Sequence, residues 1–166
     1  MNKNLENPLE KHYTPKFLLE DLNSLVKEFA PNPTEFLENS AGAGFMIDYL
    51  KEQYPNTPII AYDIYNETKR EDIKECNYLK EKIDYKEGRI AFINPPFTKG
   101  LKFAYKSLEE CDYCFAILSK NSLINIDYDK YYLLKAHYWK MVDFGSCKVD
   151  VILYALRKKK EGDTYE

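Results

Sequence analysis

Apolar positions along the chain follow two patterns that alternate from the N-terminus to the C-terminus. Apolar residues three and four apart predict helices over 14–29 and 45–54, and less regular segments predict two more over 101–109 and 128–138. Short runs of apolar residues predict strands over 58–62, 89–93, 113–118 and 149–156, and the segment 35–38 is expected to be a short strand that leads into a glycine-containing loop. Because strands alternate with helices, the sequence predicts an α/β fold with a mainly parallel sheet and helices on both faces.

Length and composition are those of one globular domain. The chain has 166 residues, of which 45% are hydrophobic and 31% are charged. This balance excludes a disordered tail, a fibre and a low-complexity linker. No apolar run approaches the ~18–20 residues of a membrane span, and the N-terminal segment lacks the apolar region of a secretory signal. We therefore expect a cytoplasmic protein that does not interact with membranes.

The charge balance bears on nucleic-acid binding. The net charge is −3 and the isoelectric point is about 5.6. These values argue against tight unaided binding to duplex DNA, because contacts to phosphates dominate such affinity. They do not exclude a local basic patch. The 15 tyrosines and 9 phenylalanines suit base stacking, but they are equally typical of an AT-rich genome.

The four cysteines are expected to be reduced in the cytoplasm; they are Cys76, Cys111, Cys114 and Cys147. Cys111 and Cys114 have the spacing of half a zinc site. No second pair follows, and the chain has only 2 histidines. We therefore expect buried free thiols at the start of a strand and no metal.

Candidate chemistry gathers at the ends of predicted strands, where the loops of a parallel sheet form a ligand crevice. A loop with Gly42 and Gly44 joins the strand at 35–38 to a helix. Such glycines let a ligand approach the free N–H groups of the helix, although a tight turn would use them equally. Asp63 ends the next strand, where an acid binds ribose hydroxyls or caps a turn. Together the three residues favour an adenosine-containing cofactor.

A second group of polar and rigid residues follows the strand at 89–93. It consists of Asn94, Pro95, Pro96 and Phe97. Proline stiffens the backbone and donates no N–H, so the Pro95 carbonyl and the Asn94 amide oxygen are two candidate acceptors. With the aromatic face of Phe97, they can hold one planar amine. A rigid turn explains the prolines but not the whole group.

The order of these motifs resembles the class I S-adenosylmethionine-dependent amino-methyltransferases, and among them the N6-adenine DNA methyltransferases. Residues 94–97 match the signature (N/D)-P-P-(Y/F/W), and 37–44 (LENSAGAG) resembles L-E-P-S-A-G-x-G. Weaker matches are 13–15 with Y-T-P, 76–79 with A-D-F-L, 116–123 with I-x-P-x-S-x-L, and 144–154 with the closing strand pair. The resemblance covers about 12–158. It implies a Rossmann-like class I methyltransferase domain over 1–158, with a polar tail at 159–166.

The resemblance also implies a role for each matching residue. The methionine end of S-adenosylmethionine would be held by Thr14, Pro15, Glu38, Asn39, Ser40, Gly42 and Gly44. Asp63 would bind the ribose hydroxyls, and Ile64 would pack on the adenine. Asn77 would meet the adenine amine, and Tyr78 would line its pocket. The target amine would be held by Asn94, Pro95, Pro96 and Phe97, with Lys99 and Phe144 as further substrate contacts.

The sequence departs from the family pattern in three places. Asn39 replaces a proline, and Asn77 replaces an aspartate. An amide accepts hydrogen bonds without charge, so we expect weaker cofactor binding. Many members carry a target-recognition domain after the last strand, where this sequence has only a polar tail. Two routes could supply specificity: a separate subunit or a second copy of the chain. Without either, we expect a short or relaxed consensus and a preference for bases that are already unpaired.

These features predict transfer of a methyl group to an exocyclic amine, first of all to N6 of adenine in DNA. Two acceptors would hold the amine in line with the methyl group, without a general base or metal. Methylation of RNA bases or of protein glutamine remains open, because these are also planar amines. A non-catalytic subunit would ordinarily lose residues 94–97. A dinucleotide oxidoreductase would need G-x-G-x-x-G spacing, which the glycine loop lacks.

Overall fold

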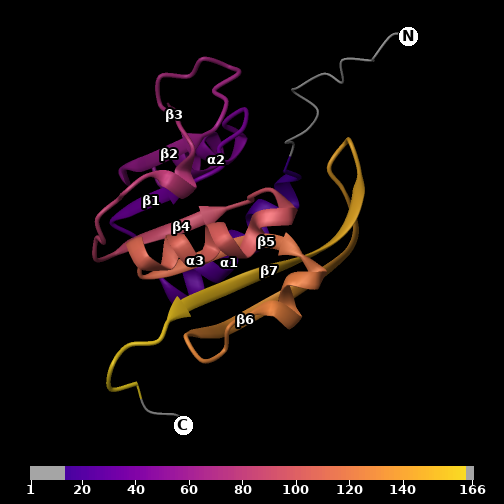
Figure 1. The fold of residues 1–166 in the computed structure, drawn as a ribbon. Helices are drawn as coiled ribbons and strands as arrows, with labels where there is room; N and C mark the ends of the chain where they lie inside the picture. Colours follow the sequence, from indigo (N-terminus) through magenta and orange to yellow (C-terminus); the bar gives the residue numbers. More distant parts are fainter. Residues whose placement is uncertain (1–13, 164–166) are drawn as a thin grey trace.

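The computed structural model describes residues 14–163, which form a sheet covered by helices on both faces (Figure 1). The sheet has seven strands in the order β3-β2-β1-β4-β5-β7-β6. They are β1 (Glu35–Glu38), β2 (Ile59–Asp63), β3 (Lys74–Glu75), β4 (Arg89–Ile93), β5 (Tyr113–Ser119), β6 (Tyr131–Asp143) and β7 (Lys148–Lys158). The first five strands are parallel, and β7 runs antiparallel to both β5 and β6. The predicted α/β fold with a mainly parallel sheet is therefore confirmed.

Two helices cover one face of the sheet, and a third covers the other. They are α1 (Lys16–Phe29), α2 (Phe45–Gln53) and α3 (Gly100–Glu110). Apolar side chains of α1 and α2 share one core cluster with the strands, and those of α3 share another. Three short 3-10 helices complete the described secondary structure: η2 (Tyr78–Lys80), η3 (Phe97–Lys99) and η4 (Lys120–Asn125).

The helix predicted over 128–138 is wrong, because this segment enters the long strand β6. Leucine, lysine and alanine favour helices, but pairing with β7 overrides that preference. Tyr131 is buried, Leu133 packs beside it in the α3-side core, and Leu133 pairs with Leu156 of β7. A bulge between Leu133 and Lys135 shifts the register. The bulge interrupts the alternation of inward and outward residues that identifies a strand.

Cys111 and Cys114 lie at the start of β5 and are buried free thiols, as expected. Burial raises the pKa of both thiols. Within residues 14–163, no three histidine, cysteine or acidic side chains are grouped closely enough to hold a metal ion. Over the same residues, no helix combines the length and apolar character needed to cross a membrane.

Candidate active site

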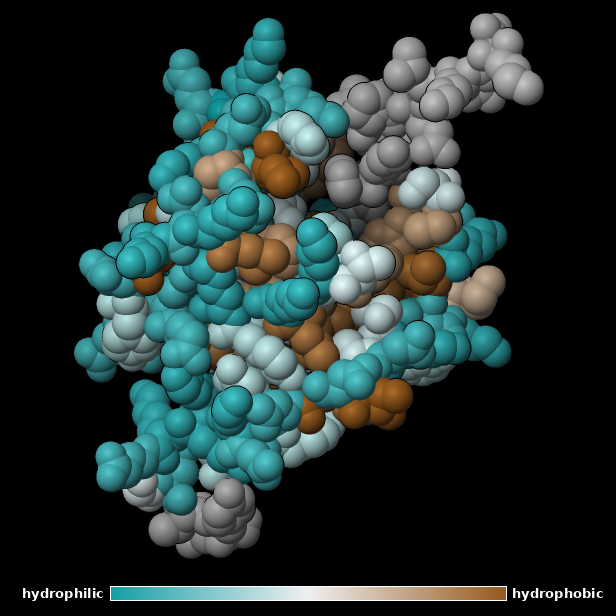
Figure 2. Space-filling model, viewed as in Figure 1, coloured by the Kyte–Doolittle hydropathy of each residue, from teal (hydrophilic) through white to brown (hydrophobic). Residues whose placement is uncertain are grey.

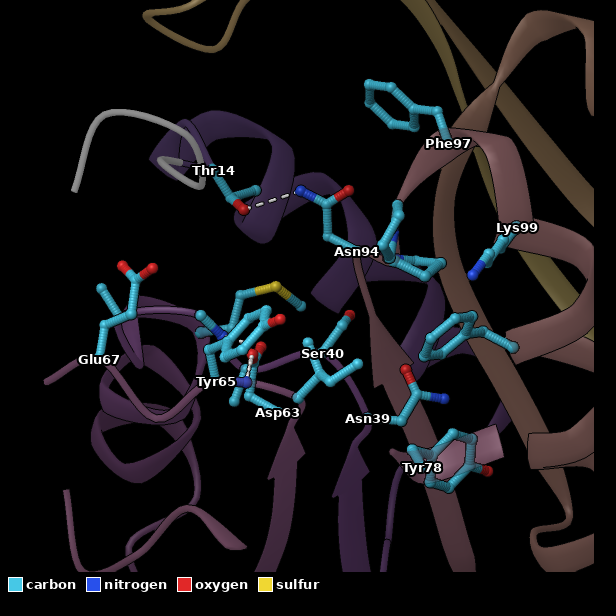
Figure 3. Close-up of a pocket in the computed structure, with 18 of the residues that line it drawn as sticks. Thr14, Asn39, Ser40, Asp63, Tyr65, Glu67, Tyr78, Asn94, Phe97 and Lys99 are labelled. Atoms are coloured by element: carbon cyan, nitrogen blue, oxygen red, sulfur yellow. Dashed lines mark hydrogen bonds between the residues drawn. The ribbon is translucent and has the colours of Figure 1, made fainter. Parts of the chain in front are cut away.

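A cavity of about 380 Å³ opens at the carboxyl ends of β1, β2 and β4. Strand order reverses between β1 and β4, and loops that leave a parallel sheet on either side of such a point enclose a crevice. The predicted site residues that line this cavity are Thr14, Asn39, Ser40, Gly42, Asp63, Ile64, Asn77, Tyr78, Asn94, Pro95, Pro96, Phe97, Lys99 and Phe144. The structure therefore brings together side chains that are far apart in the sequence (Figure 3).

Three predicted site residues do not line the cavity. Pro15 precedes α1, and its carbonyl accepts a hydrogen bond from the N–H of Leu18 at 3.0 Å. Glu38 is fully buried at the end of β1. Gly44 precedes α2 with φ of 89°, and a β-carbon there would lie 2.5 Å from the Arg70 guanidinium. Each of the three is next in sequence to a residue that does line the cavity.

Asp63 determines the shape of the glycine loop. Its Oδ2 accepts a hydrogen bond from the N–H of Gly42 at 2.8 Å, and its Oδ1 accepts one from the N–H of Tyr65 at 2.9 Å. The N–H of Ala41 also donates to the carbonyl of Tyr62 at 2.9 Å. A carboxylate has about four lone-pair sites, so each oxygen of Asp63 keeps the capacity to accept from a ligand hydroxyl.

Three consecutive residues, the last of β1 and the two that follow it, carry buried polar atoms without a partner. Among the described residues, Glu38 Oε2, Asn39 Oδ1 and Ser40 Oγ are the buried side-chain nitrogen or oxygen atoms that make no hydrogen bond. Buried polar groups are nearly always paired in native proteins. Their concentration at one strand end, beside the cavity, indicates a site for a polar ligand.

Glu38 differs from an ordinary acid in its protonation. Burial raises its pKa to about 8, although the N–H of Ser40 donates to its Oε1 at 3.0 Å and favours ionisation. The negative charge of nearby Asp63 adds to the rise. At neutral pH, Glu38 is therefore mostly a neutral acid behind the glycine loop.

A hydrogen-bonded network from α3 fixes the part of the cavity around Tyr78. The Tyr78 hydroxyl donates to Glu110 Oε2 at 2.5 Å, and Asn39 Nδ2 donates to Ser107 Oγ at 2.8 Å. Burial and the contact with Glu110 raise the pKa of Tyr78, so its hydroxyl stays protonated. Sequence reasoning missed Ser107 and Glu110. The available signal was two polar residues on the apolar face of a predicted helix, beside Leu108.

Asn77 lines the cavity, but its side chain already has a local partner. Its Oδ1 accepts a hydrogen bond from the N–H of Leu79 at 3.1 Å and caps η2. An amide oxygen has two lone pairs, so one remains available to a ligand amine.

The other side of the cavity is organised around Asn94. Its Nδ2 donates to Thr14 Oγ1 at 2.9 Å, and its oxygen lies on the side away from Thr14 (Figure 3). The rings of Phe97 and Phe144 lie 5.7 Å apart at 76°. The β6–β7 turn thus brings a second aromatic ring to the residues that follow β4. An amide acceptor beside two rings can bind a planar group that carries an N–H donor.

Comparisons with known proteins identify the fold. The sequence matches no protein-family model and no curated protein. A candidate RNA methyltransferase from Pyrococcus horikoshii superposes with a TM-score of 0.69 at 14% identity, covering 95% of this chain and 92% of that one. The 23S rRNA methyltransferase ErmE superposes with a TM-score of 0.66 at 12% identity, covering 90% of this chain and 70% of that one.

The N-methyltransferase NodS from Bradyrhizobium japonicum, solved with S-adenosyl-L-homocysteine, gives a TM-score of 0.61 at 10% identity. The match covers 94% of this chain and 90% of NodS. At such identities the likeness concerns the fold alone. This chain has the fold of the class I S-adenosylmethionine-dependent methyltransferases.

Proposed function

We propose that this protein transfers a methyl group from S-adenosylmethionine to the exocyclic amine of adenine in nucleic acid. One observation carries the proposal: the Asn94 amide, oriented by Thr14, shares a single cavity with the Asp63-held glycine loop. A cofactor site and an amine-binding site are thereby adjacent, which direct transfer requires.

The residues of the cavity fit the cofactor chemically. Unpartnered oxygens at Asn39 and Ser40 suit the polar methionine end, and the Asp63 carboxylate suits two ribose hydroxyls. Tyr78 and Phe103 are stacked at 5.8 Å, and both line the cavity, where they offer an apolar surface to adenine. When bound, S-adenosylmethionine supplies a methyl group on a positively charged sulfur.

The residues after β4 would activate the amine by position. An exocyclic amine is a poor nucleophile, because its lone pair is delocalised into the ring. The Asn94 amide oxygen and the Pro95 carbonyl accept hydrogen bonds from its two N–H groups and make the nitrogen more pyramidal. Phe97 and Phe144 hold the plane of the base. These fixed dipoles favour the positive charge that develops on nitrogen during transfer. The methylated amine then releases one proton to solvent, so none of these residues has to act as a base.

DNA is the acceptor that the sequence motifs favour. RNA is a second candidate, supported by the names of two structural neighbours, ErmE and the Pyrococcus horikoshii protein. Transfer of labelled methyl groups to DNA, RNA and protein, each offered separately, tests the proposal. We expect label on adenine in a nucleic acid. Label on protein alone would contradict the adenine assignment.

Cofactor binding gives the first prediction. S-adenosylmethionine and S-adenosylhomocysteine should both raise the melting temperature, because a ligand that binds only the folded state stabilises it. Asp63→Ala should weaken the binding of both ligands at least about tenfold. The variant loses a charged hydrogen-bond acceptor and the hydrogen bond that holds the N–H of Gly42. Asp72→Ala is the matched control, because Asp72 pairs with Arg70 outside the cavity. No thermal shift at millimolar ligand would contradict the cofactor assignment.

Thr14 gives a second prediction, as a positioning residue for Asn94. Thr14→Val keeps the shape of the side chain but removes the acceptor of the Asn94 N–H, so the amide can rotate. We expect kcat to fall about tenfold, since small misplacement in an active site is costly. Thr14→Ser keeps the hydroxyl and should restore kcat. Equal kcat values for the two variants would exclude the positioning role.

A further inference from the structure

An exposed and largely apolar patch lies where α1 meets β6. The rings of Phe17 and Trp139 lie 5.0 Å apart, and these residues are 43% and 37% exposed. Lys140 and Met141 follow along the strand, and Met141 is 56% exposed. We call Phe17, Trp139, Lys140 and Met141 the rim patch. Figure 2 shows apolar and weakly polar surface on the side of the β6–β7 hairpin, next to a hollow.

The rim patch lies on two elements that also lead to residues of the target side of the cavity. Phe17 lies one helical turn beyond Thr14, and Trp139 precedes Phe144 on the same hairpin. Trp139 is five residues before Phe144, so at a maximum reach of ~3.6 Å per residue the two lie within roughly 18 Å of each other. Stacked nucleotides rise about 3.4 Å each along a strand. A strand with its target base in the cavity would therefore reach the patch within a few nucleotides.

The patch is held rigidly by two carboxylates. Trp139 Nε1 donates to Asp21 Oδ2 at 2.7 Å, which fixes the indole beside α1. Met141 has φ of 52° within a register shift of β6, a strained conformation for a bulky residue. Its N–H donates to Asp150 Oδ1 at 2.9 Å, and this contact helps to lower the pKa of Asp150 to about 2. Strained backbone conformations that the surrounding contacts maintain are typical of functional sites.

Charge distinguishes the two sides of the cavity. Lys99, Lys102 and Lys140 are exposed and have no acidic partner within residues 14–163. Near the patch, Asp21 and Asp150 accept hydrogen bonds from tryptophan, histidine, tyrosine and lysine side chains. Two further acids on the same elements, Glu20 and Asp143, each pair with a lysine, Lys16 and Lys148. Asp63 and Glu67 lie on the opposite side from Lys99 (Figure 3). A phosphate backbone would therefore follow the β6 side.

We propose that the rim patch binds the nucleotides that flank the target base in a single-stranded nucleic acid. The inference rests on the proposed function and adds the form of the substrate. Aromatic rings with nearby lysines are the usual elements of sequence-tolerant single-strand binding. Three lysines neutralise too few phosphates for tight duplex binding. A second copy is a poor occupant, because two register shifts break the outer edge of β6.

The chain offers a direct probe, because Trp139 is its single tryptophan. Tryptophan fluorescence is followed at low salt as oligonucleotides are added as single or double strands. A length of about twelve nucleotides lies within the range that single-strand-binding domains cover. We expect saturable quenching by the single strand and much weaker quenching by the duplex of the same sequence. Phe17→Ala should weaken binding of the single strand about tenfold, because a stacking contact is lost. Lys140→Ala should weaken binding of the single strand a few-fold and reduce the salt dependence of that binding.

Lys27→Ala is the matched control for Lys140→Ala, because Lys27 is an exposed lysine in the last turn of α1. In methyl transfer, both patch variants should raise KM for the single strand, with kcat and cofactor affinity unchanged. Methyl transfer without quenching would overturn this inference and leave the proposed function intact. Quenching without any transfer would support the patch and contradict the proposed function. Quenching that depends on protein concentration alone would assign the patch to a second copy and overturn the inference.

Discussion

Asn94→Ala should lower the rate of methyl transfer on the order of a hundredfold, while S-adenosylmethionine affinity stays within a few-fold of the wild type. The amide oxygen of Asn94 is one of two acceptors proposed for the target amine, and it contributes most when charge develops on nitrogen. Its Nδ2 contacts Thr14 and no residue of the glycine loop. The variant should therefore affect turnover and leave cofactor binding largely unchanged.

Single-turnover methyl transfer and calorimetric titration of the cofactor measure the two effects separately. Asn94→Asp is the matched control, since the family signature accepts either residue and aspartate keeps an acceptor oxygen. It should retain far more activity than Asn94→Ala, with some loss because a carboxylate cannot donate to Thr14. An Asn94→Ala protein that turns over at the wild-type rate would contradict the proposed mechanism.

Glu38→Gln should remove much of the pH dependence of folding stability between about pH 4.5 and 8. The pKa of Glu38 rises from 4.5 when the chain is unfolded to about 8 in the fold. The folded state therefore binds the Glu38 proton more tightly than the unfolded chain does. The resulting stabilisation of the fold is complete below the unfolded pKa of 4.5 and is lost as pH rises through the folded pKa of about 8. This difference between the two pKa values contributes on the order of 5 kcal/mol at most to the free energy of unfolding.

Urea unfolding at a series of pH values measures this effect. The wild type should lose stability as pH rises across the interval, and Glu38→Gln should give a flatter profile. Glu35 at the start of β1 is the matched control with the opposite sign. Burial alone would raise its pKa, but hydrogen bonds from Arg89 and Lys86 lower it. Glu35→Gln should therefore cost stability above the ordinary pKa of a glutamate. Parallel profiles for the wild type and Glu38→Gln would show that Glu38 is ionised in the fold.

The strands and the glycine loop were predictable because their signals are local. A buried parallel strand is apolar on both faces, so 58–62, 89–93 and 113–118 stand out as short apolar runs, and a strand overlaps each of them in the structure. The segment 35–38 (EFLE) has only two apolar residues, and it also forms a strand. The helix prediction for 128–138 was wrong because this segment is half exposed and contains a bulge. Its strand conformation depends on pairing with β7, which helix propensities do not register.

The sequence by itself determined the α/β fold, the glycine loop, and the polar and aromatic residues that follow β1, β2 and β4. Local residue patterns and the geometry of parallel strands, whose carboxyl ends share one edge, are sufficient for that. Only the tertiary structure decided that Thr14 orients Asn94 from 80 positions away, that Phe144 meets Phe97, and that Trp139 is exposed on the same rim. These contacts join elements whose spacing is set by side-chain packing across the sheet, and the order of residues along the chain carries no local signal for them.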